Sequence, residues 1–114
     1  MAKSESPRLD LPWREVSPGG IVCEPGNSVT YITGTWRSMR PVRDLEQCTQ
    51  CLICWIVCPD ASVAVNEGKI VGFDYDHCKG CGICAEQCPV TVKKAHSHTG
   101  KIGKVIQMVP ETEF

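Results

Sequence analysis

Two cysteine strings of identical spacing dominate this sequence of 114 residues. Each string holds four cysteines with two, two and three residues between them, and a proline follows the fourth cysteine. Eight of the nine cysteines belong to the strings, which are Cys48, Cys51, Cys54 and Cys58 in the first and Cys78, Cys81, Cys84 and Cys88 in the second. A spacing that occurs twice constrains the chemistry more than the number of cysteines does.

This spacing is typical of proteins that bind two [4Fe-4S] clusters. The first three cysteines of a string wrap one cluster, and the fourth, before proline, ligates the other cluster. The predicted ligands therefore cross between the strings: Cys48, Cys51, Cys54 and Cys88 for the first cluster, and Cys78, Cys81, Cys84 and Cys58 for the second. We expect an α+β fold, a two-cluster domain like the bacterial ferredoxins, with a pseudo-twofold repeat.

Disulfides and zinc sites are the alternative explanations for so many cysteines. A disulfide framework needs a secreted protein, but residues 1–7 contain no apolar stretch of the kind found in signal peptides. Structural zinc sites use separated pairs of cysteines, whereas both strings here have three cysteines at equal intervals. Iron-sulfur clusters are the preferred interpretation, and we expect a cytoplasmic protein of low-oxygen conditions.

Charge and hydropathy argue against other classes of function. The formal net charge is −1 and the chain has no basic block, so we expect no nucleic-acid partner. No apolar run reaches the length of a membrane span. Because so short a chain buries a modest core, we expect the clusters to act as the core of the domain.

The repeat continues beyond the cysteines, and we expect each copy to contain a cluster loop, a short helix after the Cys-Pro pair and two strands. In the first copy, residues 62–65 and 69–73 flank Asn66-Glu67-Gly68, a composition that favours a hairpin. In the second copy, the strands are expected at residues 92–95 and 104–109.

The connection between these last two strands is longer, at residues 96–103. It contains His96 and His98, which we expect to be solvated because no further metal ligands accompany them.

The two cluster loops differ in the residues between their cysteines. The second loop carries Gly80 and Gly82 where the first carries Gln50 and Leu52. Glycine lets backbone N–H groups approach cluster sulfur atoms, whereas an apolar shell disfavours the reduced state. We therefore expect the lower reduction potential at the Cys48 cluster.

Residues 1–43 precede the repeat and are expected to form an extended N-terminal arm, with the cluster domain at residues 44–114. The arm holds all the arginines of the chain, which are Arg8, Arg14, Arg37, Arg40 and Arg43. It also holds Trp13 and Trp36, and because Trp and Arg anchor protein interfaces, we expect it to dock on a partner subunit. The alternative is an arm that folds back over the cluster domain. Residues 20–22 and 28–33 are expected to be short strands, and Cys23 a small buried apolar residue.

The stretch Thr33-Gly34-Thr35-Trp36-Arg37, followed by Arg40-Pro41-Val42 and later by residues 74–84, carries a family resemblance. From about Leu11 onward, the chain resembles the delta subunits of the thiamine-diphosphate-dependent 2-oxoacid:ferredoxin oxidoreductases, of which pyruvate synthase is the best known. The resemblance implies a small electron-transfer subunit that works with alpha, beta and gamma subunits.

On this resemblance, thiamine diphosphate and the 2-oxoacid bind to partner subunits, and no catalytic residue lies on this chain. Electrons would leave to an external ferredoxin or to a flavin or NAD subunit. The 2-oxoacid itself stays open among pyruvate, branched-chain, aryl and phenylglyoxylate substrates. The alternatives are an independent, diffusible two-cluster ferredoxin and the iron-sulfur subunit of a different redox enzyme.

Overall fold

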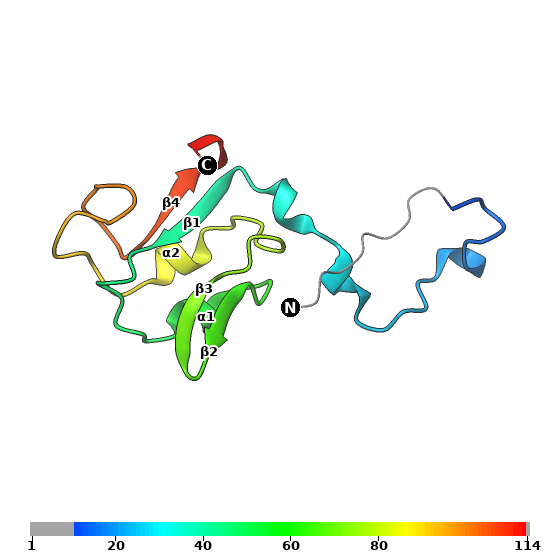
Figure 1. Cartoon of the computed structure of the whole chain (residues 1–114), viewed down its shortest axis with the longest axis horizontal. Coiled ribbons are helices and arrows are strands. Elements are labelled where there is room, and N and C mark those ends of the chain that lie inside the picture. The colour runs from blue at the N-terminus through cyan, green and yellow to red at the C-terminus, as the bar shows by residue number, and fades with distance from the viewer. Residues whose placement is uncertain (1–10, 114) are drawn as a thin grey trace. The chain divides into compact units, whose positions relative to one another are not determined.

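Each cysteine string folds into a loop followed by a short helix. In the computed structural model, which describes residues 11–113, helix α1 spans Ile53–Val57 and helix α2 spans Ile83–Gln87 (Figure 1). Both helices end at the fourth cysteine of the string, where the backbone is extended, because a residue that precedes proline avoids the helical conformation. The expectation of a helix after each Cys-Pro pair is therefore wrong, since both helices lie before it.

The first copy of the repeat continues into a hairpin of strands β2 (Val63–Asn66) and β3 (Lys69–Phe73). Glu67 and Gly68 connect the strands with φ angles of 51° and 76°. Two successive positive φ angles are typical of the type I′ turn, whose twist matches that of the strands. The hairpin prediction is confirmed, and a bulge between Ala64 and Val65 shifts its register.

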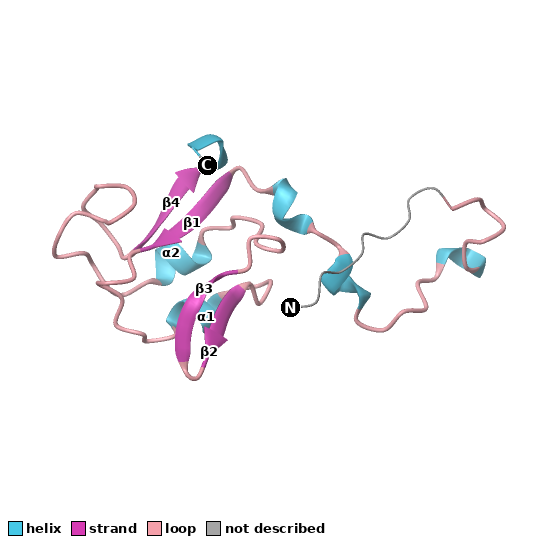
Figure 2. Ribbon diagram, viewed as in Figure 1, coloured by secondary structure: helices cyan, strands magenta, loops and turns pink. Residues whose placement is uncertain are grey.

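The second sheet joins the two ends of the cluster-bearing half. Strand β1 (Met39–Arg43) pairs antiparallel with strand β4 (Ile106–Pro110), from Met39 opposite Pro110 to Arg43 opposite Ile106. Figure 2 shows these two strands side by side, separate from the β2–β3 hairpin.

The second hairpin expected from the sequence is not formed as a strand pair. Residues 104–109 pair with β1 instead of residues 92–95, and a single bridge between Thr91 and Lys104 is what remains of the expected ladder. The loop at residues 96–103 is too long to fix the register between residues 92–95 and 104–109. Strand β1 instead pairs with β4 along all five of its residues.

The structure divides the chain before the boundary predicted at residue 43. The chain divides into two compact units, Met1–Ile32 and Thr33–Phe114, and we refer to the second as the cluster unit. Residues 33–43 therefore belong with the cysteine strings. The backbone N–H of Gly34 donates to the Asp76 carbonyl at 2.7 Å, and the Thr33 hydroxyl donates to the His77 carbonyl at 3.1 Å. Together with the β1–β4 pairing, these bonds fold residues 33–43 onto the cluster half, as the alternative to a docking arm requires.

His96 is buried, with 2% of its surface exposed, so the expectation of a solvated His96 is wrong. Its Nδ1 accepts hydrogen bonds from the backbone N–H groups of His98 at 3.1 Å and Thr99 at 3.4 Å. The proton therefore sits on Nε2, which donates to the Val105 carbonyl at 2.9 Å. His98 is exposed, as expected. The ring of His96 is thus one of the links between this loop and the core, beside the hydrogen bond from the backbone N–H of Ser97 to Asp44.

The unit Met1–Ile32, of which residues 11–32 are described, contains 3-10 helices at Pro18–Gly20 and Asn27–Thr30. The strands expected at residues 20–22 and 28–33 are therefore wrong, because no described segment in this unit offers a strand for pairing. The first ten residues of the expected arm, with Arg8, lie outside the described range.

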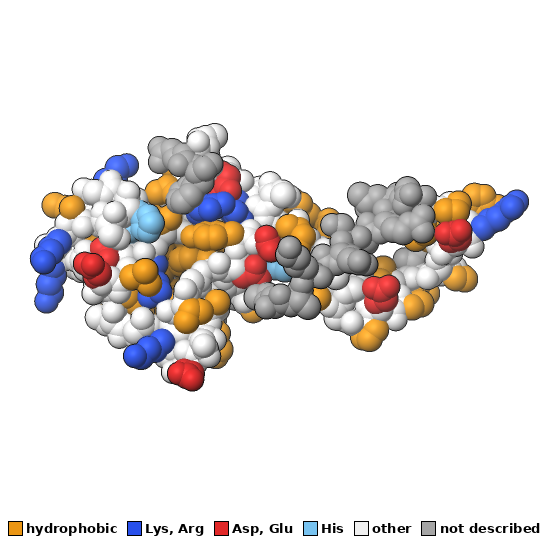
Figure 3. All heavy atoms as spheres, viewed as in Figure 1, with side chains coloured by type: hydrophobic (Ala, Val, Ile, Leu, Met, Phe, Trp, Pro, Cys, Tyr) orange, Lys and Arg blue, Asp and Glu red, His pale blue; other side chains and the backbone are white. Residues whose placement is uncertain are grey.

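Hydrophobic side chains are unusually exposed in this unit, as Figure 3 shows on the right of the view. Trp13 leaves 79% of its surface in solvent. The exposed large hydrophobic residues of the unit are Leu11, Trp13, Val16, Ile21, Val22, Val29 and Tyr31. We refer to these seven as the exposed apolar set.

The core of the other unit combines apolar side chains with cysteines. Its buried members come from both helices, both sheets and the segment after α2: Cys54, Val63, Ile70, Cys84, Cys88, Val92, Val105 and Ile106. Helices α1 and α2 pack against each other at its centre. No helix among residues 11–113 is long and apolar enough to cross a membrane.

Candidate iron-sulfur centres

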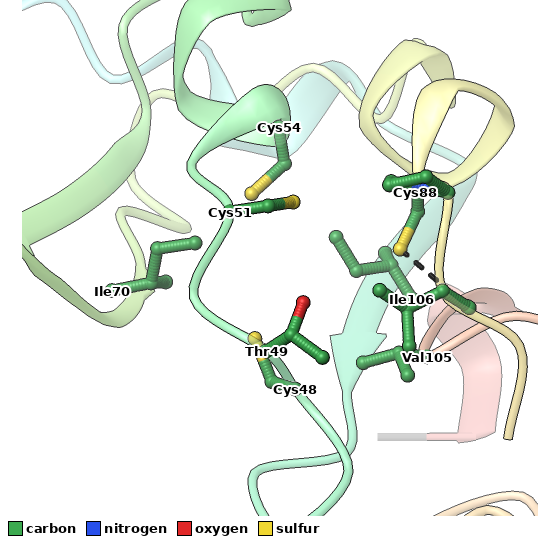
Figure 4. Close-up of a pocket in the computed structure, with 10 residues that line it drawn as sticks. Cys48, Thr49, Cys51, Cys54, Ile70, Cys88, Val105 and Ile106 are labelled. Atoms are coloured by element: carbon green, nitrogen blue, oxygen red, sulfur yellow. Dashed lines mark hydrogen bonds between the residues drawn. The ribbon is translucent and has the colours of Figure 1, made fainter. Parts of the chain in front are cut away.

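The first candidate centre is a cavity between the two cysteine strings. Cys48, Cys51 and Cys54 line it from the first string, and Cys88 lines it from the second. Figure 4 shows these four side chains around the cavity, with Ile70 on one side and Val105 and Ile106 on the other. The cavity thus brings together four thiols and an apolar wall.

The second candidate centre is a cavity whose cysteines come from the two strings in the reciprocal proportion. Cys78, Cys81 and Cys84 of the second string line it together with Cys58 of the first. Its wall also includes Val63, Phe73 and Pro41, from three different strands. The structure therefore groups the eight cysteines into the same two sets of four that the spacing predicts.

The cluster loops follow the same backbone path in both copies. Gln50 and Leu52 adopt positive φ angles of 59° and 64°, and Gly80 and Gly82, at the same positions of the second loop, have φ angles of 71° and 80°. A left-handed conformation costs a residue with a side chain about 1–2 kcal/mol. The first loop accepts this cost at two positions, which indicates that the path itself is required to turn three cysteines toward one cavity.

The surroundings of Gln50 and Gly80 explain why the two loops carry different residues at this position. Gln50 uses its Oε1 to accept a hydrogen bond of 2.8 Å from the Ile70 backbone N–H, which ties the first loop to β3. A side chain at Gly80 would collide with the Met39 carbonyl and the Arg37 side chain. Glycine at position 80 is therefore required by the close approach of residues 37–39, in addition to its φ angle.

Burial raises the pKa of the deepest thiols. The pKa of Cys84 rises to about 12, chiefly because burial disfavours the thiolate, and burial also raises the pKa of Cys54 and Cys78. Neighbouring cysteines add to this effect across the strings, since Cys88 raises the pKa of Cys54 and Cys58 raises that of Cys78. Iron ligation needs thiolates, so binding must displace these protons.

The donor sets fit [4Fe-4S] clusters, which take one cysteine thiolate at each of four iron atoms. Among residues 11–113, no three His, Cys, Asp or Glu side chains surround a single point closely enough to hold one metal ion. The four thiols of each set instead line the wall of a cavity. At Cys58, the thiol sulfur already accepts a backbone hydrogen bond from Ser62 at 3.2 Å, the kind of contact that tunes cluster sulfur atoms.

Cys23 lies outside both cavities and is exposed, so its expected burial is wrong. Its sulfur lies 3.9 Å from the Ser17 hydroxyl, within the unit Met1–Ile32.

Arg37 and Arg40, expected to anchor a partner subunit, serve inside the cluster unit. Arg37 donates from Nη1 to the carbonyl oxygens of Tyr75 and Cys78, the latter at 3.1 Å. Both guanidinium groups lie over the Tyr75 ring, at 5.2 and 4.2 Å from its centroid, and both pair with Glu111. The sequence did not reveal Tyr75 and Glu111 as partners of Arg37 and Arg40, because the two pairs lie at least 35 positions apart along the chain.

Comparison with known proteins identifies the family. Residues 40–89 match the family model described as a 4Fe-4S dicluster domain. The chain is 44% identical over 102 residues to the pyruvate synthase subunit PorD of Thermotoga maritima, which covers 90% of each chain. It is 47% identical over 75 residues to the PorD subunit of Methanocaldococcus jannaschii, covering 66% of this chain and 87% of the relative.

A third relative has a different name. Over 60 residues the chain is 48% identical to the delta subunit of the NADH-dependent phenylglyoxylate dehydrogenase of Aromatoleum evansii, covering 51% of this chain and 61% of the relative. The PorD relatives confirm the resemblance drawn from the sequence. The chain belongs to the family of the PorD subunits, the ferredoxin-like delta subunits of the 2-oxoacid:ferredoxin oxidoreductases.

Proposed function

We propose that this chain binds two [4Fe-4S] clusters and relays electrons through them, as the electron-transfer subunit of a 2-oxoacid oxidoreductase complex. Cys48, Cys51, Cys54 and Cys88 would ligate the first cluster, and Cys78, Cys81, Cys84 and Cys58 the second. The observation that carries the proposal is the crossed composition of the two cavities, each of which draws three thiols from one string and one from the other. The two copies of the repeat would then be related by a pseudo-twofold axis.

The clusters would supply one-electron transfer, and the protein supplies ligation, a dry environment and a short path. Cys54 and Cys84 line different cavities but belong to one buried core, in which α1 packs against α2. This packing supports adjacent centres that can pass electrons from one to the other. No residue of this chain is proposed to act as an acid, a base or a nucleophile, so the chain is a non-catalytic subunit of the oxidoreductase.

The carbon chemistry is proposed to take place on other chains. Thiamine diphosphate and the 2-oxoacid would bind to alpha, beta and gamma partner subunits, and the acyl product would be transferred to coenzyme A. The names of the relatives include both a pyruvate synthase and a phenylglyoxylate dehydrogenase that depends on NADH. The substrate of this complex and its acceptor, a ferredoxin or a flavin or NAD subunit, are therefore decided by chains other than this one. We also expect the complex to be cytoplasmic.

The exposed apolar set is the proposed attachment point to those partners. Large apolar side chains anchor protein interfaces by filling pockets on the other subunit, and residues 11–32 carry seven of them. Arg14 lies 5.1 Å above the Trp13 ring, which adds a cation to this surface. Arg37 and Arg40, which the sequence marked as interface residues, are not part of this proposed attachment point, because both form ion pairs with Glu111.

Anaerobic purification of the tagged chain from its own cells tests the proposal. The preparation should contain about eight iron and eight sulfide atoms per chain, together with subunits that bind thiamine diphosphate. A chain that elutes alone from native extract would instead support a diffusible ferredoxin, and a flavin, nickel or molybdenum enzyme in the preparation would support a different redox complex.

The crossed ligation has its own pair of variants. Cys58→Ser should damage the cluster of Cys78, Cys81 and Cys84, although Cys58 lies in the other string. The matched control, Cys23→Ser, should keep the full iron content because Cys23 lines neither cavity. Damage to the Cys48 cluster in Cys58→Ser, with the other cluster intact, would contradict the ligand sets.

A further inference from the structure

Arg43, the last residue of β1, has an unusual environment for a charged side chain. It leaves 6% of its surface exposed, although arginine is almost never buried without a partner. Its Nη2 donates to the Ile70 carbonyl at 3.0 Å, which satisfies part of the guanidinium. Its Nη1 is buried and has no hydrogen-bond partner among residues 11–113.

The neighbours of Arg43 place it behind the wall of the first cavity. Ile70, which accepts its hydrogen bond, lines that cavity. Ile106, its partner in the β1–β4 pairing, lines the same cavity from the other side. Arg43 itself is not part of the cavity surface. The guanidinium is therefore hydrogen-bonded to one residue of the cavity wall, and its strand position pairs with a second.

No acidic side chain in the described part of the chain forms an ion pair with Arg43. The nearest carboxylate in sequence, Asp44, is occupied elsewhere: it accepts hydrogen bonds from the Gln47 side chain and from the backbone of Glu46 and Ser97. A buried cation without a counter-charge is strongly destabilising. The described part of the chain therefore holds a buried positive charge with no carboxylate partner.

A [4Fe-4S] cluster with four thiolate ligands is net negative, and one-electron reduction adds a further negative charge. A nearby buried cation stabilises both states but stabilises the reduced state more, because the attraction grows with the charge of the cluster. We propose that Arg43 is the built-in counter-charge of the cluster held by Cys48, Cys51, Cys54 and Cys88, and that it raises the reduction potential of this cluster. This inference rests on the proposed function of the four cysteines as ligands.

The apolar residues around the first loop favour a low potential for the same cluster, so Arg43 would oppose them. The second cavity has a different arrangement: Arg37 lies beside Cys78, but Glu111 accepts hydrogen bonds from it and from Arg40. Lys79, in the second loop, is exposed and pairs with Asp60 at 3.2 Å. Arg37 and Arg40 share the carboxylate of Glu111 and Lys79 has that of Asp60, whereas Arg43 has no carboxylate partner in the described chain. The effect proposed for Arg43 concerns the Cys48 cluster because its neighbours Ile70 and Ile106 line that cavity.

The test is an anaerobic redox titration of the full-length chain followed by electron paramagnetic resonance. The shifted NMR signals of the cysteine β-protons distinguish the two clusters. Arg43→Met and Arg43→Gln remove the charge, and Gln keeps an amide donor at the position of the arginine Nε. Arg43→Lys keeps the charge. Lys69→Met is the matched control, because it removes an exposed, solvent-screened cation from the residue next to Ile70.

Both neutral variants should lower the ratio of reduced to oxidised Cys48 cluster about tenfold at a fixed ambient potential, which corresponds to about 59 mV for one electron. The Cys78 cluster should change much less, and Arg43→Lys and Lys69→Met should stay near the unmodified chain. An unchanged potential of the Cys48 cluster in Arg43→Gln would overturn the proposal and leave Arg43 a packing residue. Equal shifts in the reduction potentials of the two clusters would also overturn the proposal.

Assembly gives a second readout if the neutral variants bind less iron. Loss of the Cys48 cluster alone, with the Cys78 cluster retained and with both clusters present in Arg43→Lys, would support the counter-charge. Loss of both clusters, or the same loss in Arg43→Lys, would overturn it, because the requirement would then be for the shape of arginine and not for its charge. Failure of the ligand sets themselves would appear separately, in the Cys58→Ser and Cys23→Ser pair.

Discussion

The guanidinium of Arg37 donates two hydrogen bonds to the carboxylate of Glu111, from Nε to Oε2 at 2.9 Å and from Nη2 to Oε1 at 3.1 Å. Arg40 donates two more to the same carboxylate. These ion pairs link the start of the cluster unit to its end beside Cys78, whose carbonyl accepts a hydrogen bond from Arg37. Arg37 and Arg40 therefore give residues 33–43 a structural role in the cluster unit.

Glu111→Gln should lower the thermal unfolding midpoint of the holo chain, because both guanidinium groups then lose their charged acceptor. The two arginines lower the pKa of Glu111 from 4.5 to about 2. The carboxylate therefore contributes fully above about pH 4.5, and its contribution disappears as the pH falls toward 2. The midpoint difference between Glu111→Gln and the unmodified chain should accordingly be the same at pH 7 and at pH 5.5. Glu46→Gln, at an exposed residue, is the control; an equal loss there would contradict the assignment.

Gly80→Ala and Gly82→Ala form a matched pair. Both positions have positive φ angles, so each substitution should cost about 1–2 kcal/mol through the backbone. At position 82 the added methyl meets nothing closer than Met108 Cγ at 3.9 Å, whereas at position 80 it collides with the Met39 carbonyl. Gly80→Ala should therefore destabilise the holo chain clearly more, as measured by anaerobic thermal unfolding. Equal losses would show that residues 37–39 do not pack on this loop.

Truncation separates the exposed apolar set from the cluster unit. A chain that begins at Thr33 should keep both clusters and most of its stability, because the unit Thr33–Phe114 keeps β1 and its ion pairs. It should fail to co-purify with the partner subunits, since the exposed apolar set is gone. A chain that begins at Asp44 should lose stability and iron as well, because β4 then has no partner strand. Normal assembly of the Thr33 chain with its partners would contradict the docking role.

His96→Ala should destabilise the cluster unit by about 1–3 kcal/mol, because it leaves the backbone N–H groups of His98 and Thr99 without their acceptor and removes one of the two donors to the Val105 carbonyl. The exposed His98 provides the control, and His98→Ala should change the unfolding midpoint little. Neither substitution should alter the cluster potentials if His96 serves the loop alone. A large potential shift in His96→Ala would assign it a redox role that its contacts do not indicate.

The sequence by itself determined the features that depend on short spacings. The interval between cysteines predicted the two groups of four that line the two cavities, and the Asn66-Glu67-Gly68 stretch predicted the hairpin of β2 and β3. Such patterns act through neighbouring residues, so they can be read without knowing what packs against them. Ligation by these cysteines stays a prediction until iron is measured.

Only the tertiary structure decided which distant segments meet. Composition marked Arg37, Arg40 and Arg43 as candidates for an interface, but β1 pairs with β4, and this pairing turns the first two toward Glu111 and buries the third behind Ile70 and Ile106. The same packing buries His96 against Val105. Contacts of this kind depend on the free energy of the assembled core, because a strand edge or a buried polar group selects its partner in space and not along the chain.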